Sequence, residues 1–543
     1  MRSVSVRRTF ALCAAVLSLS AFPAGAGATS SQPQIDAAIE KAIVYVRGQQ
    51  ELPTGAMPGF GGDWTATALA AAGVHPADVR GPGGGDPSFQ DFLLEEYAQP
   101  SWNEDPPGGT VAEFSRATLI AAAAGLDPAR LAANGNQPAQ LASRWNPATG
   151  GFGEAGGTGT NSVIFSILAM RVTPLPGWAL APAVTFLRRN QHDDGGWGFG
   201  TALTPVAQSE PSEEDTTGAA VAALCEAGVP AYDPAVASAL SFLRGRLINA
   251  TGAIDYVWGP NSDVNAWVVS GLNACGIDPQ SAAWTTAAGK TPVDFLLSLQ
   301  VAAGPEAGGF GIEDTSFASL YSTQDALRAI SGAAFAAGAP PRENPAEPQL
   351  RPLPEVADGT PVPHVLAVEL APGNVRICKV TAPSGAPLTE VLAAAETSSH
   401  PAGCVTWFSL ADDEVESIGG VFPEGADEAW LARLDFGPAE VAAGQPVGFG
   451  EVISLRIGRR LVSADDSAED PQQGPTGSPG QTGPAGQPGK RGRRGAKGGP
   501  GHRGAKRACG KVRRQTTGKR RGKCKSGKHR RGQTARGAGG ARG

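Results

Sequence analysis

The stretch that decides the fold is Gln191-His192-Asp193-Asp194-Gly195-Gly196-Trp197-Gly198. It follows an amphipathic segment, residues 182–190, and precedes a second apolar segment that begins near Asp215. Glycine lets the chain reverse tightly, and the aromatic side chain can pack back over the helix just completed. Weaker copies follow helix-like runs at residues 59–62, 150–153 and 308–311. A turn that recurs at a near-constant interval predicts a repeat architecture.

Six helix pairs can be laid along this repeat. The first members alternate charged and apolar residues, as half-exposed helices do, whereas the second members are rich in alanine and nearly uncharged, which predicts burial on all sides. Glycine and then proline at several helix ends are stop signals. The second members are expected to begin near Asp63, Glu113, Asn161, Asp215, Asp263 and Ser322. We therefore expect a mainly α fold, in which a six-pair α/α barrel (toroid) has an outer and an inner ring.

The pattern QxxDGGWG at residues 191–198 resembles the prenyltransferase/squalene oxidase repeat, which is found in squalene cyclases and protein prenyltransferases. The resemblance implies that residues 33–338 form a terpenoid cyclase-like α/α toroid. It does not carry the activity of those enzymes with it, since one fold hosts many functions.

Beyond the toroid the sequence changes character. Residues 339–361 are rich in proline and predict an extended interdomain linker. Residues 362–463 carry strand-like patterns around one helical run and predict a small α+β, β-grasp-like module. Pieces such as TEVLAAA (389–395) and SIGGV (417–421) resemble the C-terminal domain of the transcobalamin and intrinsic-factor family. That family also places such a module behind an α/α barrel.

The C-terminal part of the chain separates charge. A short acidic linker, 464–473, precedes eleven Gly-X-Y triplets at 474–506, a collagen-like period. The basic remainder, 507–543, cannot bury a core and is expected to be disordered. Residues 474–543 hold 21 Lys or Arg and no Asp or Glu, while the mature chain before them carries a net charge of −30. We expect the tail to bind an anionic cell-wall polymer, the triplets to permit a trimer, and the acidic body to avoid nucleic acid.

The N-terminal residues 1–28 have the basic, apolar and small-residue regions of a secretory signal peptide. Arg7-Arg8-Thr9-Phe10 also approaches a twin-arginine signal, so export by either the Sec or the twin-arginine route is expected. No other run reaches the roughly 18 apolar residues of a membrane helix. We therefore expect a secreted or cell-surface-associated protein without a transmembrane segment.

Six cysteines remain after removal of the signal peptide, two in each of three regions, which favours local disulfides in an exported chain. Cys378 and Cys404 are expected to form a disulfide, because both fall on predicted strands of one small module. Cys225 and Cys275 either pair or remain buried thiols.

Candidate ligand-binding residues lie where the inner helices begin, since six helix N-termini with free N–H groups would surround one mouth. Many of the residue types found there are also ordinary N-caps, so capping is an alternative interpretation of each. The residues predicted to line a pocket are Asp63, Trp64, Glu113, Asn161, Asp215, Thr216, Asp263, Trp267, Tyr321, Ser322, Thr323 and Gln324.

An enzymatic alternative rests on residues 212–217. Class II terpene cyclases carry a DxDDTA motif, and alignment on Asp215-Thr216 puts Ser212 at the first Asp and Glu214 at the proton donor. Protonating an alkene needs a strong acid and aromatic walls for the carbocation, whereas the inner helices are mostly Ala and Val. A prenyltransferase would need Asp, Cys and His zinc ligands. No histidine lies in a predicted inner helix, so no metal is expected.

The sequence favours an exported, non-enzymatic small-molecule-binding protein, with the ligand between the toroid mouth and the β module. A corrinoid or another bulky molecule is the candidate ligand, because the layout resembles that of cobalamin carriers and Tyr321-Ser322-Thr323 resembles a segment of that family. The sequence does not identify the ligand. A terpene cyclase with Glu214 and Asp215 as catalytic residues is the alternative. A surface-attached structural protein is the second alternative.

Overall fold

The computed structural model describes residues 29–459, apart from 60, 84, 99–108, 132–135, 155–156, 201–209, 348, 352, 354, 412–413, 426 and 436–441. The predicted signal peptide, acidic linker, Gly-X-Y segment and basic tail lie outside the described residues. The described chain is mainly α-helical with a small β part, as predicted. Within it, no helix is both long and apolar enough to cross a membrane.

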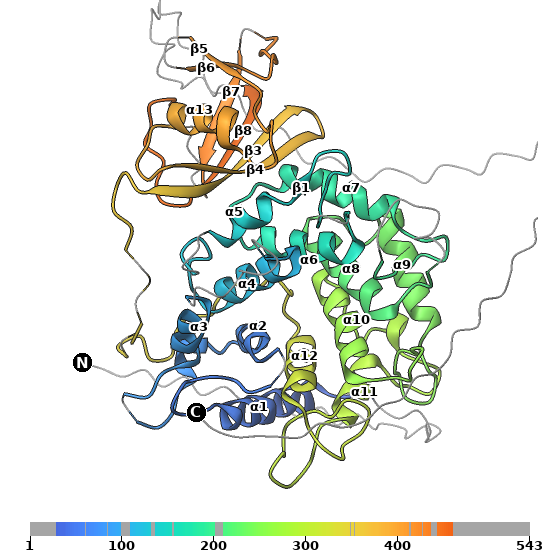
Figure 1. Ribbon diagram of the computed structural model, residues 1–543. Coiled ribbons are helices and arrows are strands. Elements are labelled where there is room, and N and C mark those ends of the chain that lie inside the picture. The colour runs from blue at the N-terminus through green and yellow to red at the C-terminus, as the bar shows by residue number, and fades with distance from the viewer. Residues whose placement is uncertain are drawn as a thin grey trace, which may run out of the picture. The chain divides into compact units, whose positions relative to one another are not determined.

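Six helices follow one another around a closed ring (Figure 1). Each contacts the next along the chain, and the last returns to contact the first. They begin within two residues of the predicted starts and are rich in buried alanine and valine. These inner helices are α2 (Thr65–Ala71), α4 (Val111–Ala123), α6 (Thr160–Arg171), α8 (Glu214–Glu226), α10 (Ser262–Ala274) and α12 (Leu320–Ile330).

The other helices of this part pack outside the ring, where α5, α7, α9 and α11 contact α4, α6, α8 and α10 respectively, and α1 contacts α12. Apolar and charged residues alternate in these helices because only one side of each is buried. In α7, Phe186 and Leu187 are buried, whereas Arg188 and Arg189 are exposed. The outer helices are α1 (Gln32–Gln49), α3 (Phe89–Tyr97), α5 (Gln137–Ala142), α7 (Ala181–Arg189), α9 (Pro234–Gly245) and α11 (Pro292–Ser298). Short elements between them are η1 (Gly62–Trp64), η2 (Pro76–Asp78), η3 (Gly177–Leu180), η5 (Ala282–Trp284), β1 (Trp145–Asn146) and β2 (Gly151–Phe152).

The repeated turn holds an outer helix, an inner helix and the next outer helix together. Trp197 is fully buried and donates from Nε1 to the carbonyl of Leu187 on α7 (2.8 Å), so the ring packs back over the helix just completed. Its backbone N–H donates to Thr217 Oγ1 on α8 (3.0 Å). Gln191 Nε2 donates to the carbonyl of Ala235 on α9 (2.7 Å). Gly195 has a positive φ of 93°, and a Cβ there would lie 2.7 Å from the Ser238 carbonyl oxygen, so only glycine fits.

The turn at residues 300–311 repeats these contacts and closes the ring. Gln300 Nε2 donates to the carbonyl of Ala38 on α1 (2.8 Å), as Gln191 does to α9. The Phe310 N–H donates to Thr323 Oγ1 on α12 (2.8 Å), as that of Trp197 does to Thr217. The last repeat thus uses the first helix of the chain as its next outer helix.

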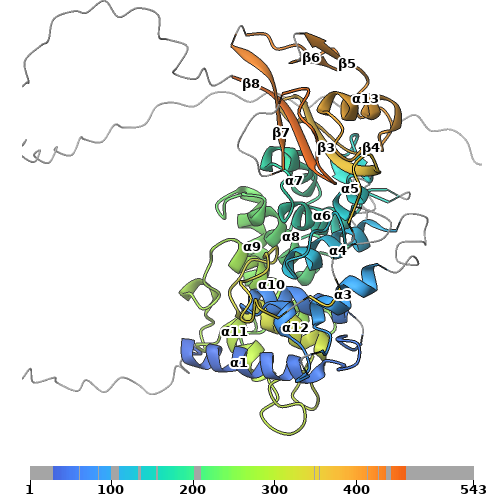
Figure 2. The same ribbon diagram turned by 90° about the vertical axis from the view of Figure 1, so that its left-hand side faces the viewer.

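The β part is a mixed four-stranded sheet with one helix on it (Figure 2). The strand order is β4-β3-β8-β7, in which β3 and β8 are parallel and the other pairs antiparallel. A two-stranded ribbon, β5 with β6, accompanies it. The elements are β3 (Pro361–Ala371), β4 (Asn374–Pro383), α13 (Leu388–Ser398), β5 (Phe408–Ala411), β6 (Glu414–Ile418), β7 (Glu428–Leu434) and β8 (Val452–Arg459).

The sheet is buried on both faces, which explains the continuous apolar run of β3. Leu366 and Val368 pack in one cluster with the α13 residues, while Val365 and Ala367 belong to the core of the helical part. Successive side chains of a strand point to opposite faces, so one strand serves two cores. Asn136, the N-cap of α5, donates to the carbonyl of Gly450 (2.8 Å) beside the same interface.

Two disulfides join the four cysteines of the described residues. Cys225 and Cys275 link α8 to the end of α10 with a Cα separation of 5.0 Å, so these cysteines are not free thiols. Cys378 on β4 is joined to Cys404 with Cα atoms 6.1 Å apart. Cys404 lies in an irregular segment and not on the strand expected there, because β5 begins only at Phe408.

Candidate functional site

A cavity of about 410 Å³ lies at the N-terminal ends of the inner helices. Its wall comes from the helical part, and none of the described residues of the β part lines it. The lining residues are Trp64, Arg116, Asn161, Phe165, Phe199, Asp215, Thr216, Ala219, Trp267, Tyr321, Gln324, Asp325, Arg328 and Phe335.

Seven residues predicted from the sequence are brought together in this wall: Trp64, Asn161, Asp215, Thr216, Trp267, Tyr321 and Gln324. Five others are placed elsewhere. Asp63 and Glu113 line a second cavity of about 310 Å³, next to Arg116. Asp263 and Ser322 are not part of the wall of the larger cavity.

Four of these five have side-chain partners within the protein, and Asp263 accepts a hydrogen bond from the Ser262 hydroxyl (3.2 Å). Asp63 accepts a hydrogen bond from the Tyr97 hydroxyl (2.6 Å) and is ion-paired with Arg116. Glu113 forms a capping box with Thr110, to whose N–H it is bound at 2.7 Å. Thr323 holds the Phe310 turn described above.

None of the six residues predicted at the helix starts is itself an N-cap. The cap of α2 is Trp64, and the caps of the other five helices lie upstream of the predicted residues. Those that accept a hydrogen bond through the side chain are Thr110 of α4, Asn261 of α10 and Ser319 of α12. The capping interpretation is therefore wrong for Asn161 and Asp215, which lie one residue inside their helices. Their side chains line the cavity instead.

Four aromatic side chains form one cluster in the wall. Trp267 stacks on Phe335 with ring centroids 4.8 Å apart, and Phe165 packs edge-on against Trp267 at 5.6 Å. Trp64 completes the cluster at 5.7 Å from Phe335. The inner helices themselves are mostly Ala and Val, as the sequence shows, yet the cavity they surround is aromatic. Trp64 and Trp267 of this cluster are among the residues predicted to line the pocket, whereas Phe165 and Phe335 are not.

Buried charges lie beside this cluster. Arg328 is only 1% exposed, is ion-paired with Asp325 (2.7 Å) and lies over the rings of Phe335 and Trp267. Burial raises the pKa of Asp263 and Asp325, and repulsion by Asp325 raises that of Asp263 further. The two carboxyl groups therefore bind protons more readily than ordinary aspartates.

Of the seven lining residues that the sequence did not identify, five lie one helical turn after a predicted residue. Phe165, Ala219, Asp325 and Arg328 lie four residues after a predicted mouth residue, so they occupy the next turn of the same helix face. Arg116 lies three residues after Glu113 in the same way. Phe335 follows α12 in the chain and folds back into the ring, and no periodic pattern marks such a return.

The residues of the enzymatic alternative are separated. Glu214 is ion-paired with Arg246 (3.1 Å) and lines a different cavity of about 500 Å³. Asp215 lines the cavity of about 410 Å³ with the aromatic cluster, and it accepts a hydrogen bond from the Thr216 N–H (2.7 Å). No group of His, Cys, Asp and Glu that could hold a metal ion occurs among the residues the structure describes.

Comparison with known proteins gives no family. No family model matches the chain, and no curated protein matches it. Among solved structures, the type II terpene cyclase MstE from Scytonema in its apo form is 18% identical over 56% of this chain and 99% of its own, with a TM-score of 0.38. Haptocorrin in complex with Cbi is 12% identical over 79% and 98%, with a TM-score of 0.31.

A third similar structure is the ent-copalyl diphosphate synthase from Streptomyces platensis, 18% identical over 50% of this chain and 49% of its own, with a TM-score of 0.33. Because these TM-scores are below 0.5, the similarities carry no argument for a fold or a ligand.

Proposed function

We propose that this chain is an exported, non-enzymatic small-molecule-binding protein whose ligand occupies the cavity at the inner-helix N-termini. The observation that supports it most is an aromatic cluster beside buried polar side chains in one concave wall. Binding sites for small molecules typically combine an apolar, aromatic lining with a few placed polar groups. The architecture proposed with it is a six-pair α/α toroid followed by a β-grasp-like module.

The ligand belongs to the helical part in this proposal, and not between the toroid and the β module. A cavity of about 410 Å³ is at the lower end of the roughly 300–1,000 Å³ typical of drug-sized ligands. A corrinoid is larger than such ligands and would extend out of the cavity. We therefore keep the corrinoid as one test compound rather than as the assigned ligand.

The proposal is tested by native mass spectrometry of the protein purified from its own host, which should show a co-purifying molecule with one-to-one stoichiometry. Ala219 lines the cavity, so Ala219→Phe should abolish that adduct by filling it. Ala237→Phe, on the exposed side of α9, is the matched control and should keep the adduct. An adduct that persists in Ala219→Phe would place the ligand elsewhere, and added cobalamin tests the corrinoid directly.

A class II cyclase is the second candidate, and the aromatic cluster is the observation in its favour, because aromatic faces stabilise carbocations. The carboxyl groups beside the cavity do not favour a cyclase reaction. A raised pKa makes Asp263 and Asp325 weaker acids, whereas protonation of an alkene needs a stronger one. We expect squalene and linear polyprenyl compounds to give no cyclised product. Product formation that Asp325→Asn or Glu214→Gln abolishes would reverse this assignment.

For the basic tail, residues 474–543, we propose attachment to an anionic cell-wall polymer. The support is its charge alone: 21 Lys or Arg without one acidic residue. Binding of this kind releases counterions and weakens steeply with salt. A chain ending at Gln473 should lose salt-sensitive retention on cell walls while keeping its ligand. Equal retention of both chains at low salt would remove the tail from attachment.

A further inference from the structure

One side of the cavity wall has more hydrogen-bond donors than acceptors. Arg116 Nε, Gln324 Nε2 and Arg328 Nε are buried and have no hydrogen-bond partner among the residues the structure describes. All three side chains line the cavity, and Gln324 and Arg328 are 0% and 1% exposed. A buried donor without an acceptor costs roughly 1–3 kcal/mol. Three in one wall point to an acceptor that the chain itself does not supply.

Two of these donors each lie near the Trp64 ring of the aromatic cluster. The Arg116 guanidinium carbon is 5.8 Å from the centre of the Trp64 ring. A Cβ on Gly61 would lie 3.5 Å from Gln324 Nε2 and 3.6 Å from Trp64 Cδ1, so Gln324 Nε2 also neighbours Trp64. Burial lowers the pKa of Arg116, which means that its cation is incompletely compensated there despite Asp63.

We infer that the ligand carries an anionic oxygen head, such as a carboxylate, sulfonate or phosphate, bound by Arg116 and Gln324, and an apolar body that packs on Trp64, Phe165 and Trp267. This inference rests on the proposed function, since it assigns the ligand class of the same cavity. Hydrogen bonds between charged partners are about twice as strong as neutral ones, so the head dominates selectivity.

An organic cation is the opposing ligand class, because carboxylates such as Asp215 also line the cavity. Aromatic faces bind cations, but the chain's own Arg328 guanidinium already lies beside two of the four rings. The guanidinium carbon of Arg328 lies 4.3 Å from the centre of the Phe335 ring and 5.0 Å from that of Trp267. A cationic ligand would meet this charge on the rings it needs.

The test compares two fluorescent probes with one skeleton: anilinonaphthalene sulfonate, which has the anionic head, and N-phenylnaphthylamine, which lacks it. The sulfonate should bind the full-length protein at least about tenfold more tightly than the neutral probe. Gln324→Glu removes the free donor and adds a negative charge, but keeps the oxygen that accepts from Thr65 Oγ1. It should weaken sulfonate binding at least about tenfold and leave the neutral probe unchanged.

The controls separate this inference from the proposed function. Ala219→Phe should abolish binding of both probes, and Gln324→Met should reproduce the loss for the sulfonate alone if Gln324→Glu does not fold by near-ultraviolet circular dichroism. Equal affinity of the two probes, with both lost in Ala219→Phe, would overturn the anionic head and leave the cavity as a binding site. Binding of both probes that Ala219→Phe does not alter would overturn both proposals.

Discussion

At the scale of single residues, Glu226 fixes one wall of the candidate site from outside it. Its two carboxylate oxygens accept the N–H groups of Phe335 (2.7 Å) and Ala336 (3.0 Å), just after the last inner helix. This pair of bonds holds the segment whose Phe335 ring enters the aromatic cluster. Burial raises the pKa of Glu226 to about 7, although both hydrogen bonds lower it.

The pKa of Glu226 predicts how stability depends on pH. Its folded-state pKa of about 7 lies above the ordinary 4.5, so the unfolded chain ionises first and the free energy of unfolding falls as pH rises between these values. Glu226→Gln removes this loss and can still accept through its amide oxygen. Relative to wild type, the variant should gain about 3 kcal/mol between pH 4.5 and pH 8 in urea unfolding. The exposed Glu40→Gln is the control, and parallel pH profiles for Glu226→Gln and wild type would contradict the argument.

The site residues that follow the helical repeat could be predicted from the sequence, and those that do not follow it could not. Trp64, Asp215, Trp267 and Gln324 were identified because each lies at or just inside the start of an inner helix. Phe335 was not, since its place depends on a chain reversal fixed by Glu226, on a different helix. The buried charges were missed for a related reason: Arg328 and Asp325 form a pair only one turn apart, which reads in the sequence as an ordinary helix-surface pair.

At the scale of elements, the inner ring depends on close approach of α8 and α10. A Cβ on Gly218 would lie 2.8 Å from the backbone carbon of Trp267, and one on Gly271 would lie 2.6 Å from the Gly218 carbonyl oxygen. Two helices that touch through backbone atoms cannot admit even a methyl group without moving apart. The Cys225–Cys275 disulfide joins the same two segments.

We expect Gly218→Ala to destabilise the protein by about 1–3 kcal/mol, because the added methyl group overpacks a contact between backbones. Gly245→Ala is the matched control, since no atom lies within 4 Å of its Cβ position and alanine favours the helix. In urea unfolding, the free energy of unfolding should fall for Gly218→Ala and should rise or stay unchanged for Gly245→Ala. Equal effects would show that helix propensity and not close packing decides at Gly218.

Element boundaries were predictable to different degrees. The inner helices were placed within two residues, because glycine turns punctuate them at both ends. The β part was less exact: β5 begins at Phe408, four residues after the predicted start at Cys404. Cys404 and Val405 are buried although they lie in a loop. A buried loop of this kind, anchored by a disulfide, has the same apolar pattern in the sequence as a strand.

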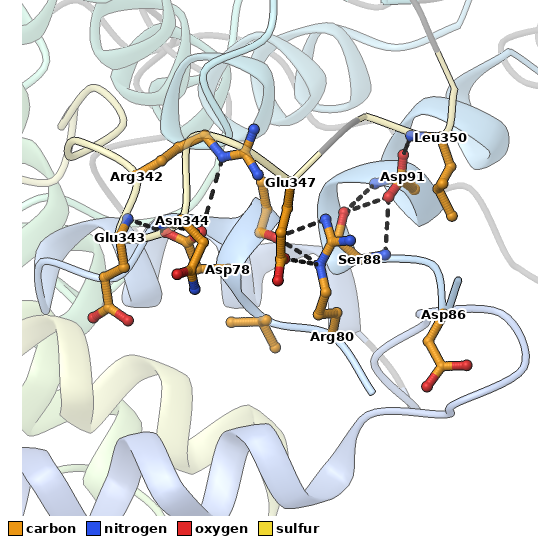
Figure 3. A network of polar contacts seen from close by, with 12 residues as sticks. Asp78, Arg80, Asp86, Ser88, Asp91, Arg342, Glu343, Asn344, Glu347 and Leu350 are labelled. Carbon is orange, nitrogen blue, oxygen red and sulfur yellow. Dashed lines mark hydrogen bonds and ion pairs between the residues drawn. The ribbon is translucent and has the colours of Figure 1, made fainter. Parts of the chain in front are cut away.

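At the scale of the whole molecule, the described part of the Pro-rich segment after the ring is held at two places by carboxylates of the helical part (Figure 3). Asp78 accepts the N–H groups of Glu343 (2.7 Å) and Asn344 (3.3 Å). Asp91 accepts those of Leu350 (2.8 Å) and Arg351 (3.1 Å). Two carboxylates of the first repeats thus bind the extended backbone that leads to β3, a role that composition alone could not reveal.

Asp78→Asn should release the first of these attachments. An amide has one acceptor oxygen, so it can satisfy only one of the two N–H groups, and it loses the ion pair with Arg342. The amides of Glu343 and Asn344 should then exchange with solvent at least about tenfold faster, which hydrogen exchange with peptide-level mass spectrometry measures. Asp86→Asn is the control, since the bond that Asp86 makes with the described residues stays within its own loop, to the Gly83 N–H (2.8 Å). Exchange at Leu350 and Arg351 should stay slow in both variants, because Asp91 still holds them. If the whole segment exchanges faster in Asp78→Asn, its attachment is cooperative; if none of it does, Asp78 does not hold the segment.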